Sequence, residues 1–291
     1  MNILYRAPLL AHIIPDSACL KLIYFCSFWK KLDLKNPKTF TAKLQWLKLY
    51  NRKPEYTKMV DKHEVKKYVA GKIGKEYVIP TLGKWKRFDE IDFEKLPNQF
   101  VLKCTHDSGS LVICSDKRRF DRRAAQKKLE RCLRKNYFYM GREWPYKHVR
   151  PRIIAEPYLV DESGYELKDY KFFCFDAQAK VMYMAADRCK EGEDTKFDFF
   201  DMEFRHLPIK NGHENANTEI FCREPLPKMK ELAEKLSSGM PHVRIDFYYA
   251  GGKIYFGEMT FFHLSGFVPL EPKEWDAKLG EWLHLPPPQT F

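Results

Sequence analysis

The sequence lacks several patterns that would assign the chain to a class directly. It has eight cysteines but no C-x-x-C pair, so it indicates reduced thiols in a cytosolic protein rather than a disulfide frame or a zinc site. No apolar run is long and uninterrupted enough to span a bilayer. We also expect no signal peptide, because no apolar stretch precedes a small-residue cleavage site. Internal repeats and low-complexity tracts are absent as well.

Two familiar nucleotide-binding fingerprints are missing too, since neither a P-loop nor a Rossmann turn occurs. There is no nucleic-acid-binding motif. What remains is a chain of 291 residues with 44% apolar and 31% charged residues, which is typical of a soluble globular protein with one large domain or two to three lobes. The formal charge of +12 predicts an anionic partner without choosing among nucleotide, acidic glycan, nucleic acid and membrane surface.

Two carboxylates near the C-terminus carry the clearest chemical signal. Asp246 and Glu258 lie in short apolar runs separated by Gly251-Gly252, a pattern that predicts a β-hairpin. Paired acids in an apolar hairpin repel each other and lose hydration, so we expect a cation there, and carboxylate oxygens suit Mg²⁺ that also holds phosphates. Arg244 falls on the same strand face as Asp246 and adds a site for anionic oxygen. The alternative is a surface hairpin with solvated acids.

A second segment upstream fits the same chemistry. Lys103 lies near the end of an apolar run, and the loop His106-Asp-Ser-Gly-Ser110 follows it. Such a loop offers backbone N–H groups and hydroxyls with little steric bulk, so it can fold over phosphates. Taken alone, a Ser-Gly loop is most often only a turn.

Periodicity and capping residues predict the remaining elements. Helices are expected from Asp16-Ser17 to about Lys31, from Thr39 or Thr41 through Leu49, from Asp61-Lys62 onward, from Arg122 to Lys135 with Asp121 as cap, and from Pro227 to Ser237. Strands are expected at 77–80, 100–104, 111–114, 152–156, 170–175 and 180–185. Residues 188–223 are expected to be mostly loop, as in a lid, apart from the aromatic cluster Phe197 to Phe204.

In this order the parts resemble the ATP-grasp superfamily, and ten short runs are similar to the TupA-like ATP-grasp family. The runs are Pro37-Lys-Thr-Phe, Trp46-Leu-Lys-Leu-Tyr50, Tyr56-Thr-Lys58, Val60-Asp-Lys62, Phe100-Val-Leu-Lys-Cys104, Gly141-Arg-Glu-Trp-Pro-Tyr146, Pro151-Arg-Ile-Ile-Ala-Glu156, Leu167-Lys-Asp-Tyr-Lys-Phe172, Val243-Arg-Ile-Asp246 and Gly257-Glu-Met-Thr260. The resemblance covers roughly residues 35 to 285. It implies an α+β ATP-grasp fold in which two α+β lobes sandwich ATP. The implied division is an N-terminal helical cap (1–58), a small lobe (59–155) and a large lobe with the metal site (156–291).

The resemblance also implies a role for each matching residue. Lys62 and Lys103 would hold the α- and β-phosphates, Asp107, Ser108, Gly109 and Ser110 would cover the γ-phosphate, and the backbone of Glu156, Pro157, Tyr158 and Leu159 would grip adenine. Asp169, in preference to Glu166, would bind the ribose. Asp246, Glu258 and Thr260 would bind Mg²⁺. Arg244 would stabilise the oxyanion, and Arg188 is either a further contact to phosphate or acceptor or a plain surface arginine.

One residue departs from the pattern of the superfamily. Many ATP-grasp ligases have Asn two residues after the metal-binding Glu, whereas this chain has Thr260. A threonine hydroxyl is a shorter and weaker ligand than an amide oxygen, so the number of Mg²⁺ ions, one or two, stays open. His263, in the segment that follows, is either a substrate contact or an ordinary loop residue.

The family is associated with teichuronic-acid and capsular polysaccharide gene clusters. The resemblance therefore implies an ATP- and Mg²⁺-dependent carboxylate–amine ligase that works through an acyl phosphate in the cytoplasm, with peripheral attachment to the inner membrane face left open. The partners would be a nucleotide, an acidic sugar or polysaccharide precursor and an amine donor, but no nucleic acid. Two alternatives remain, namely a sugar kinase and a non-catalytic binder of anionic glycans through the basic helix 122–135, whose charges are otherwise a solvated face.

Overall fold

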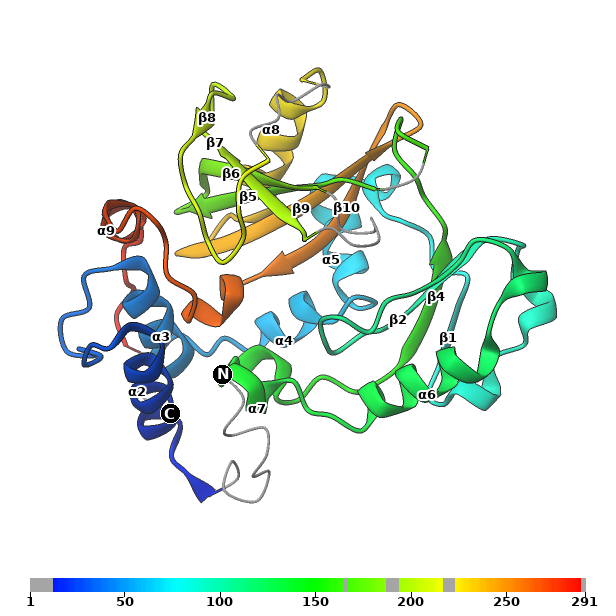
Figure 1. Ribbon diagram of the computed structural model, residues 1–291, viewed down its shortest axis with the longest axis horizontal. Helices are drawn as coiled ribbons and strands as arrows, with labels where there is room; N and C mark the ends of the chain where they lie inside the picture. The colour runs from blue at the N-terminus through cyan, green and yellow to red at the C-terminus, as the bar shows by residue number, and fades with distance from the viewer. Residues whose placement is uncertain (1–12, 165–166, 187–193, 217–222, 289–291) are drawn as a thin grey trace. The chain divides into compact units, whose positions relative to one another are not determined.

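The computed structural model describes residues 13–164, 167–186, 194–216 and 223–288, and the chain divides into two compact units (Figure 1). Unit 1 consists of Met1–Arg52 and Asp161–Phe291, and unit 2 consists of Lys53–Val160. Each unit contains one antiparallel sheet. The chain thus leaves unit 1 after its first helices and returns to it for the larger sheet.

The sheet of unit 1 has six strands in the order β10-β9-β5-β6-β7-β8. The strands are β5 (Asp169–Phe175), β6 (Gln178–Ala186), β7 (Lys196–Phe200), β8 (His206–Leu207), β9 (His242–Ala250) and β10 (Lys253–Thr260). Strand β5 lies inside the sheet, between β9 and β6, and all seven of its residues are buried. A strand buried on both sides needs cover on both faces of the sheet.

Helix α8 (Leu226–Leu236) covers one face of this sheet, above the strands in Figure 1. Its buried residues recur at helical spacing, as expected for an amphipathic helix; they are Leu226, Met229, Leu232, Ala233 and Leu236. Successive side chains of a strand alternate between faces. Phe173 and Phe175 of β5 contact Phe40, the first residue of helix α3 (Phe40–Tyr50). We call the face on which they lie the α3 face.

The N-terminal helices are joined to the C-terminal part of unit 1. Helix α2 (Asp16–Phe28) and α3 precede unit 2, and α9 (Glu274–Trp282) lies near the end of the chain. The backbone N–H and the hydroxyl of Thr41 both donate to the Asp276 carboxylate, at 2.8 and 2.7 Å. The Lys43 ammonium donates to the carbonyls of Gly280 and Leu283. The division of the structure therefore differs from the three sequential segments expected at 1–58, 59–155 and 156–291.

Unit 2 contains a four-stranded sheet in the order β1-β4-β2-β3. Its strands are β1 (Gly83–Trp85), β2 (Phe100–Cys104), β3 (Val112–Cys114) and β4 (Ile153–Pro157), and its helices are α4 (Glu55–Val60), α5 (Val65–Ile73), α6 (Arg122–Leu133) and α7 (Phe138–Gly141). Helix α6 buries Ala125 and Leu129 against the strands. As expected, Asp121 caps this basic helix by accepting the backbone N–H of Ala124 at 2.9 Å.

The structure corrects three local expectations. The first helix is preceded by Pro15 with no side-chain cap, rather than being capped by Asp16 or Ser17, although Thr39 does cap α3. The helix expected from Asp61 starts at Val65, because the Asp61 carboxylate accepts the backbone N–H groups of His63 and Glu64 and forms a turn. Residues 77–80 do not form a strand. The backbone N–H of Val78 is bonded to the Lys75 carbonyl in a 3₁₀ turn, and β1 forms the edge instead.

Part of the segment expected to be mostly loop belongs to the sheet. Strand β7 pairs with β6, and β8 pairs with β7. Phe197, Phe199 and Phe200 of β7 are buried, so the first part of the aromatic cluster forms a sheet strand, and Phe204 follows it outside the strand. Among the described residues, no helix is both long enough and apolar enough to cross a membrane.

Candidate functional site

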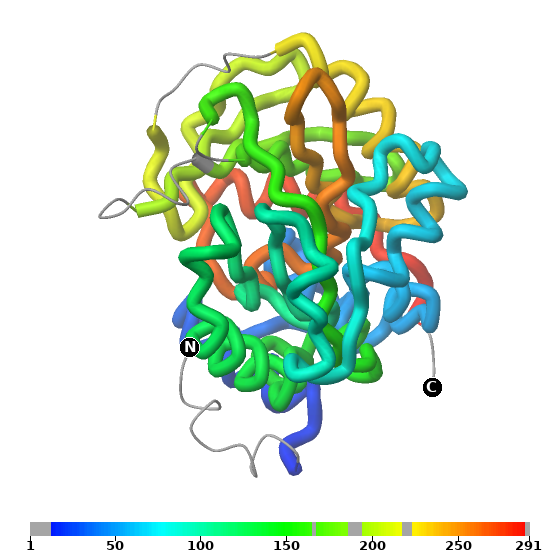
Figure 2. The backbone as a smooth tube through the Cα atoms, turned by 90° about the vertical axis from the view of Figure 1, so that its right-hand side faces the viewer, coloured from blue at the N-terminus to red at the C-terminus, as the bar shows by residue number. Residues whose placement is uncertain are grey.

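The two C-terminal carboxylates lie directly opposite each other in the β9–β10 hairpin, the orange hairpin that turns at Gly251 and Gly252 (Figure 2). Phe256 pairs with Phe247, but the next pair is Glu258 with Asp246, so Gly257 is an extra residue in β10. Such a bulge changes the face to which the following side chains point. Without it, Glu258 would point to the face opposite that of Asp246. The bulge therefore brings the two carboxylates onto the α3 face together.

A glycine is needed at the bulge. A Cβ at position 257 would lie 3.0 Å from the ring of Tyr248 and 3.2 Å from the carbonyl oxygen of Asp246. Both distances are shorter than ordinary contacts of a side chain. A side chain at the bulge would therefore force the Tyr248 ring or the Asp246 backbone to move by a few tenths of an ångström.

Arg244 provides positive charge between the two acids. Its Nε and Nη2 donate to the two oxygens of Asp246, both at 2.7 Å, in a bidentate pair. Nη2 also donates to the Glu258 carboxylate and to the Thr260 hydroxyl, each at 3.0 Å. Burial acts to lower the pKa of Arg244, but Asp246, Tyr183 and Glu258 together raise it. Three side-chain oxygens therefore surround one cationic nitrogen.

The structure adds a lysine that the sequence analysis did not select. Lys171 of β5 lies opposite Asp246 of β9, and its ammonium donates to Asp246 and lies 3.1 Å from an Asp169 oxygen. Burial acts to lower the pKa of Lys171, but the neighbouring Asp246 raises it. The signal was in the run Leu167 to Phe172, because Lys171 follows Asp169 at the strand period of two.

His263 contacts Arg244 from the side opposite Asp246. The Arg244 Nη1 donates to the His263 Nδ1 at 2.8 Å. The Tyr183 hydroxyl lies 3.4 Å from Arg244 Nη1 as well. His263 is 4% exposed. Burial, and then the charge of Arg244, hold the pKa of His263 well below its usual range. His263 is therefore a neutral acceptor inside the cluster rather than an ordinary loop residue.

The chemistry of the donors decides whether a divalent cation fits this cluster. Asp246, Glu258 and Thr260 offer hard oxygen ligands on neighbouring strands, all within bonding distance of Arg244 Nη2. Two carboxylates and a hydroxyl do not complete an octahedron, which suits Mg²⁺ that keeps water and phosphate oxygens as its other ligands. Among the described residues no group of three His, Cys, Asp or Glu side chains forms an all-protein metal site. The donor set thus fits Mg²⁺ only together with an anionic ligand.

In unit 2 the charged residues gather around Glu156. The carboxylate of Glu156 on β4 lies 2.6 Å from the ammonium groups of both Lys66 and Lys103. Burial would raise the pKa of Glu156, but Lys103 and Lys66 lower it. Lys66, which the sequence analysis did not select, also donates to the Ile79 carbonyl at 2.8 Å. The Glu156 side chain therefore orients two lysines, whereas the role predicted from the sequence involved only its backbone.

The Gly/Ser loop is held by its own side chains. The Ser110 hydroxyl donates to the Asp107 carboxylate at 2.6 Å and accepts the backbone N–H of Cys104 at 2.8 Å. The Lys62 ammonium donates to the Asp107 carbonyl. Ser108 and Gly109, with Gly109 at φ +91°, stay exposed at the tip. The loop thus offers its tip, rather than the side chains of Asp107 and Ser110, to a ligand.

The other expected residues are distributed as follows. Pro157 ends β4, and Tyr158 and Leu159 follow it as half-buried residues outside the sheet. Asp169 is 1% exposed beside Lys171. Arg188 and Glu166 lie outside the described residues.

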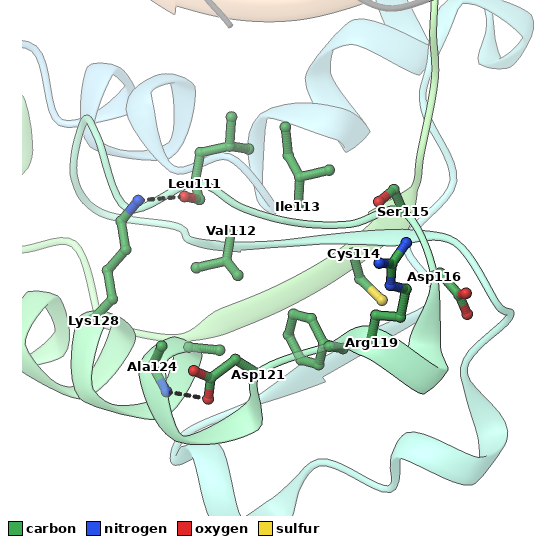
Figure 3. Close-up of a pocket in the computed structure, with 12 residues that line it drawn as sticks. Leu111, Val112, Ile113, Cys114, Ser115, Asp116, Arg119, Asp121, Ala124 and Lys128 are labelled. Atoms are coloured by element: carbon green, nitrogen blue, oxygen red, sulfur yellow. Dashed lines mark hydrogen bonds between the residues drawn. The ribbon is translucent and has the colours of Figure 1, made fainter. Parts of the chain in front are cut away.

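A cavity of about 590 Å³ in unit 2 lies apart from these charged groups (Figure 3). It is formed by β3 and α6, and all its lining residues fall between Leu111 and Lys128. In Figure 3, Lys128 reaches from α6 to the Leu111 carbonyl, and Asp121 caps the helix at Ala124. The cavity is therefore a gap at the sheet edge and includes none of the site residues expected from the sequence.

Comparison with models of known protein families gives a match. A family model described as TupA-like ATPgrasp matches residues 42–284, more than half of the chain. A search of curated proteins finds no match.

Several solved structures are distantly similar. The D-alanine–D-alanine ligase of Bacillus anthracis matches at 15% identity, with 70% of this chain and 57% of that chain covered and a TM-score of 0.39. The VanG D-Ala:D-Ser ligase of Enterococcus faecalis matches at 14%, with 76% and 54% covered and a TM-score of 0.41. A RimK domain ATP-grasp protein of Sphaerobacter thermophilus matches at 11%, with 80% and 70% covered and a TM-score of 0.44. The chain spans little more than half the length of the two ligases.

Proposed function

Because the chain belongs to the TupA-like ATP-grasp family, we propose that it is an ATP-dependent ligase that joins a carboxylate to an amine. One observation carries this proposal. Asp246 and Glu258 face each other across β9 and β10, with Arg244 between them and Lys171 alongside. Two acids and two bases on one sheet face form a site for a metal-bound polyphosphate.

For the nucleotide, the proposal keeps the roles that the family resemblance implies. Lys62 and Lys103 hold the α- and β-phosphates, and the exposed tip of the loop, Ser108 and Gly109, covers the γ-phosphate with backbone N–H groups. The backbone from Glu156 to Leu159 receives adenine, and Asp169 receives the ribose. The Glu156 carboxylate supports this arrangement because it fixes the side chains of Lys103 and Lys66.

Asp246 and Glu258, with the Thr260 hydroxyl as a weaker third ligand, would hold Mg²⁺. When bound, the ion neutralises charge on the phosphate oxygens. The Asp246 carboxylate already balances Arg244 and Lys171. The Asp246 carboxylate therefore holds Arg244 and Lys171 in place for the reaction.

In the reaction, a substrate carboxylate oxygen bonds to the γ-phosphorus as the bond to the ADP oxygen breaks, giving an acyl phosphate. An amine nitrogen then bonds to the acyl carbon, phosphate leaves, and the nitrogen loses a proton. Arg244 and Lys171 stabilise the negative charge that spreads over the transferring group. Water must be excluded because an acyl phosphate hydrolyses readily.

The substrates belong to the proposal as well. We infer that the carboxylate is a uronic acid or a Glu-like group of a capsular or cell-wall polysaccharide precursor, and that the amine is an amino acid or amino alcohol. The net charge of +12 supports an acidic acceptor. The enzyme would work in the cytoplasm, where ATP is available, or at the inner membrane face.

ADP release tests the proposal. Mg-ATP is incubated with a panel of uronates and a panel of amines, and we expect release only when one of each is present. A kinase would instead release ADP with a sugar alone and leave a stable phosphomonoester. No stimulation by any pair, together with salt-sensitive binding of acidic polymers and no binding of ATP, would favour a glycan-binding protein instead.

A further inference from the structure

A buried chain of hydrogen bonds leads from the loop after β8 to the guanidinium of Arg244. The Asn211 Oδ1 and the His263 Nε2 lie 2.7 Å apart, and the His263 Nδ1 lies 2.8 Å from Arg244 Nη1. Asn211, His263 and Arg244 are 2%, 4% and 6% exposed. Because little water reaches these groups, their polar atoms must find hydrogen-bond partners within the protein.

The direction of each hydrogen bond in this chain is fixed. Arginine has only donors, so the His263 Nδ1 must be the acceptor and carries no proton. The Asn211 Nδ2 donates to the carbonyls of Val268 and Pro269, at 3.2 and 2.9 Å. The amide oxygen of Asn211 therefore faces His263, and the His263 Nε2 must carry the proton.

Both ends of the chain thus select the same tautomer of His263. A second proton on the ring would place an N–H against the Arg244 guanidinium, which has no acceptor. The low pKa of His263, caused by burial and then by Arg244, agrees with a neutral ring. The hydrogen bonds to Arg244 and Asn211 therefore determine which ring nitrogen of His263 carries the proton.

The His263 ring is also held mechanically. It packs edge-on against Phe173, with ring centroids 5.0 Å apart at 81°. The loop behind it contains Leu264 and Ser265 with φ of 46° and 56°. Gln45 of α3 donates to the carbonyls of Ser265 and Gly266, at 3.2 and 2.9 Å, which supports this uncommon backbone conformation.

Arg244 uses two of its edges for different purposes. Its Nε and Nη2 bond to Asp246, and Nη2 also bonds to Glu258 and Thr260. On the other edge, Nη1 has a short bond of 2.8 Å to His263 and a longer one of 3.4 Å to the Tyr183 hydroxyl, so His263 provides the closer contact that limits tilting of the guanidinium. We propose that Asn211 is a positioning residue, which through His263 fixes the orientation of Arg244 for the transferring phosphoryl group.

The catalytic half of this inference rests on the proposed function, whereas the tautomer and the fixed arginine do not. The first test is therefore ¹⁵N NMR of histidine-labelled full chain without nucleotide, with the His263→Asn variant used for assignment. At neutral pH we expect an unprotonated Nδ1 and a protonated Nε2. A protonated Nδ1, or a ring protonated on both nitrogens, would overturn the inference whatever the enzyme does.

The second test compares two asparagines that bond in the same way. The Asn215 Nδ2 also donates to two carbonyls, those of Phe197 and Ile209, at 2.6 and 2.9 Å. Asn211→Leu should lower kcat about 10- to 100-fold, the range of the hydrogen bond between His263 and the charged Arg244 that Asn211 orients, and leave KM for ATP within about 2-fold. Asn215→Leu should lose similar thermal stability but keep kcat. Equal losses of kcat in both variants would mean that Asn211 only supports the loop.

A double-mutant cycle separates positioning from simple loss of packing. In the His263→Leu background, Asn211→Leu should change kcat by less than about 2-fold, because its route to Arg244 is already gone. Effects that multiply independently would contradict the chain. If the wild-type chain releases no ADP with any substrate pair, the proposed function fails, and the NMR result still decides the tautomer.

Discussion

At the scale of single residues, the two acids of the hairpin differ in exposure although they face each other. The Asp246 side chain is fully buried and contacts both Arg244 and Lys171, whereas the Glu258 side chain is 35% exposed. Removal of a buried counter-charge leaves cations without a partner, which costs far more than the loss of a partly exposed pair. Experiment can therefore distinguish the two acids: Asp246 should contribute to both stability and activity, and Glu258 to activity alone.

We predict that Asp246→Asn and Glu258→Gln both lower turnover at least about 100-fold, because both remove a magnesium ligand. Only Asp246→Asn should also lower the free energy of unfolding, by about 3 kcal/mol. Turnover assays with urea unfolding of both variants provide the check. A Glu258→Gln protein with normal turnover would remove Glu258 from the metal site.

His242 makes stability depend on pH. Its ring is fully buried beside Phe40 and Phe175, its Nδ1 lies 2.9 Å from the Cys174 carbonyl, and its pKa is lowered to about 3, first by burial. The unfolded chain binds a proton near pH 6.5 and the folded chain does not. The stabilisation is thus present above pH 6.5 and is lost as the pH falls from 6.5 toward 3.

We therefore expect His242→Gln to flatten the fall of unfolding free energy between pH 6 and pH 4 by about 1.4 kcal/mol per pH unit. Urea unfolding across this range measures the slope. If the two proteins show the same slope, His242 does not titrate as the structure implies.

At the scale of elements, the bulge at Gly257 places Glu258. Gly257→Ala would bring a Cβ within 3.0 Å of Tyr248 and 3.2 Å of the Asp246 backbone, so the Tyr248 ring and the paired strands must move by a few tenths of an ångström. We predict a loss of about 1–3 kcal/mol in unfolding free energy and at least about 10-fold lower turnover, because Glu258 moves with the strand.

Gly71→Ala serves as the matched control, since Gly71 lies in α5 with no atom within 4 Å of an added Cβ. That variant should be as stable as the parent, or up to about 1 kcal/mol more stable, and fully active. If Gly257→Ala behaves like this control, the register of the hairpin does not depend on the bulge.

At the scale of the whole molecule, the sequence predicts what depends on neighbours along the chain. The β9–β10 hairpin, the cap at Thr39 and the cap at Asp121 are local patterns of this kind. The ATP-grasp fold itself follows from ordered motifs, and the family match over residues 42–284 agrees with it.

The sequence did not predict contacts between distant elements. Lys171 reaches Asp246 only because β5 pairs with β9, 75 residues away. The ammonium of Lys66, in α5, pairs with Glu156 on β4 of unit 2. The spacing of residues along the sequence does not predict this contact. The prediction of an edge strand at 77–80 was wrong because of a local contact rather than a distant one. Its apolar pattern suited a strand, but a local 3₁₀ turn took the Val78 N–H.

Transfer of an oxygen atom from the substrate carboxylate to phosphate distinguishes a carboxylate–amine ligase from a kinase and from a binding protein. A uronate and amine pair that stimulates ADP release is supplied with ¹⁸O in the carboxylate, and the released phosphate is analysed by mass spectrometry. Because the carboxylate oxygen attacks phosphorus and leaves with phosphate, we expect one ¹⁸O atom in each phosphate, and at least about 100-fold slower release of labelled phosphate by the Glu258→Gln variant. Unlabelled phosphate, or phosphate that stays on a sugar hydroxyl, would contradict a carboxylate–amine ligase.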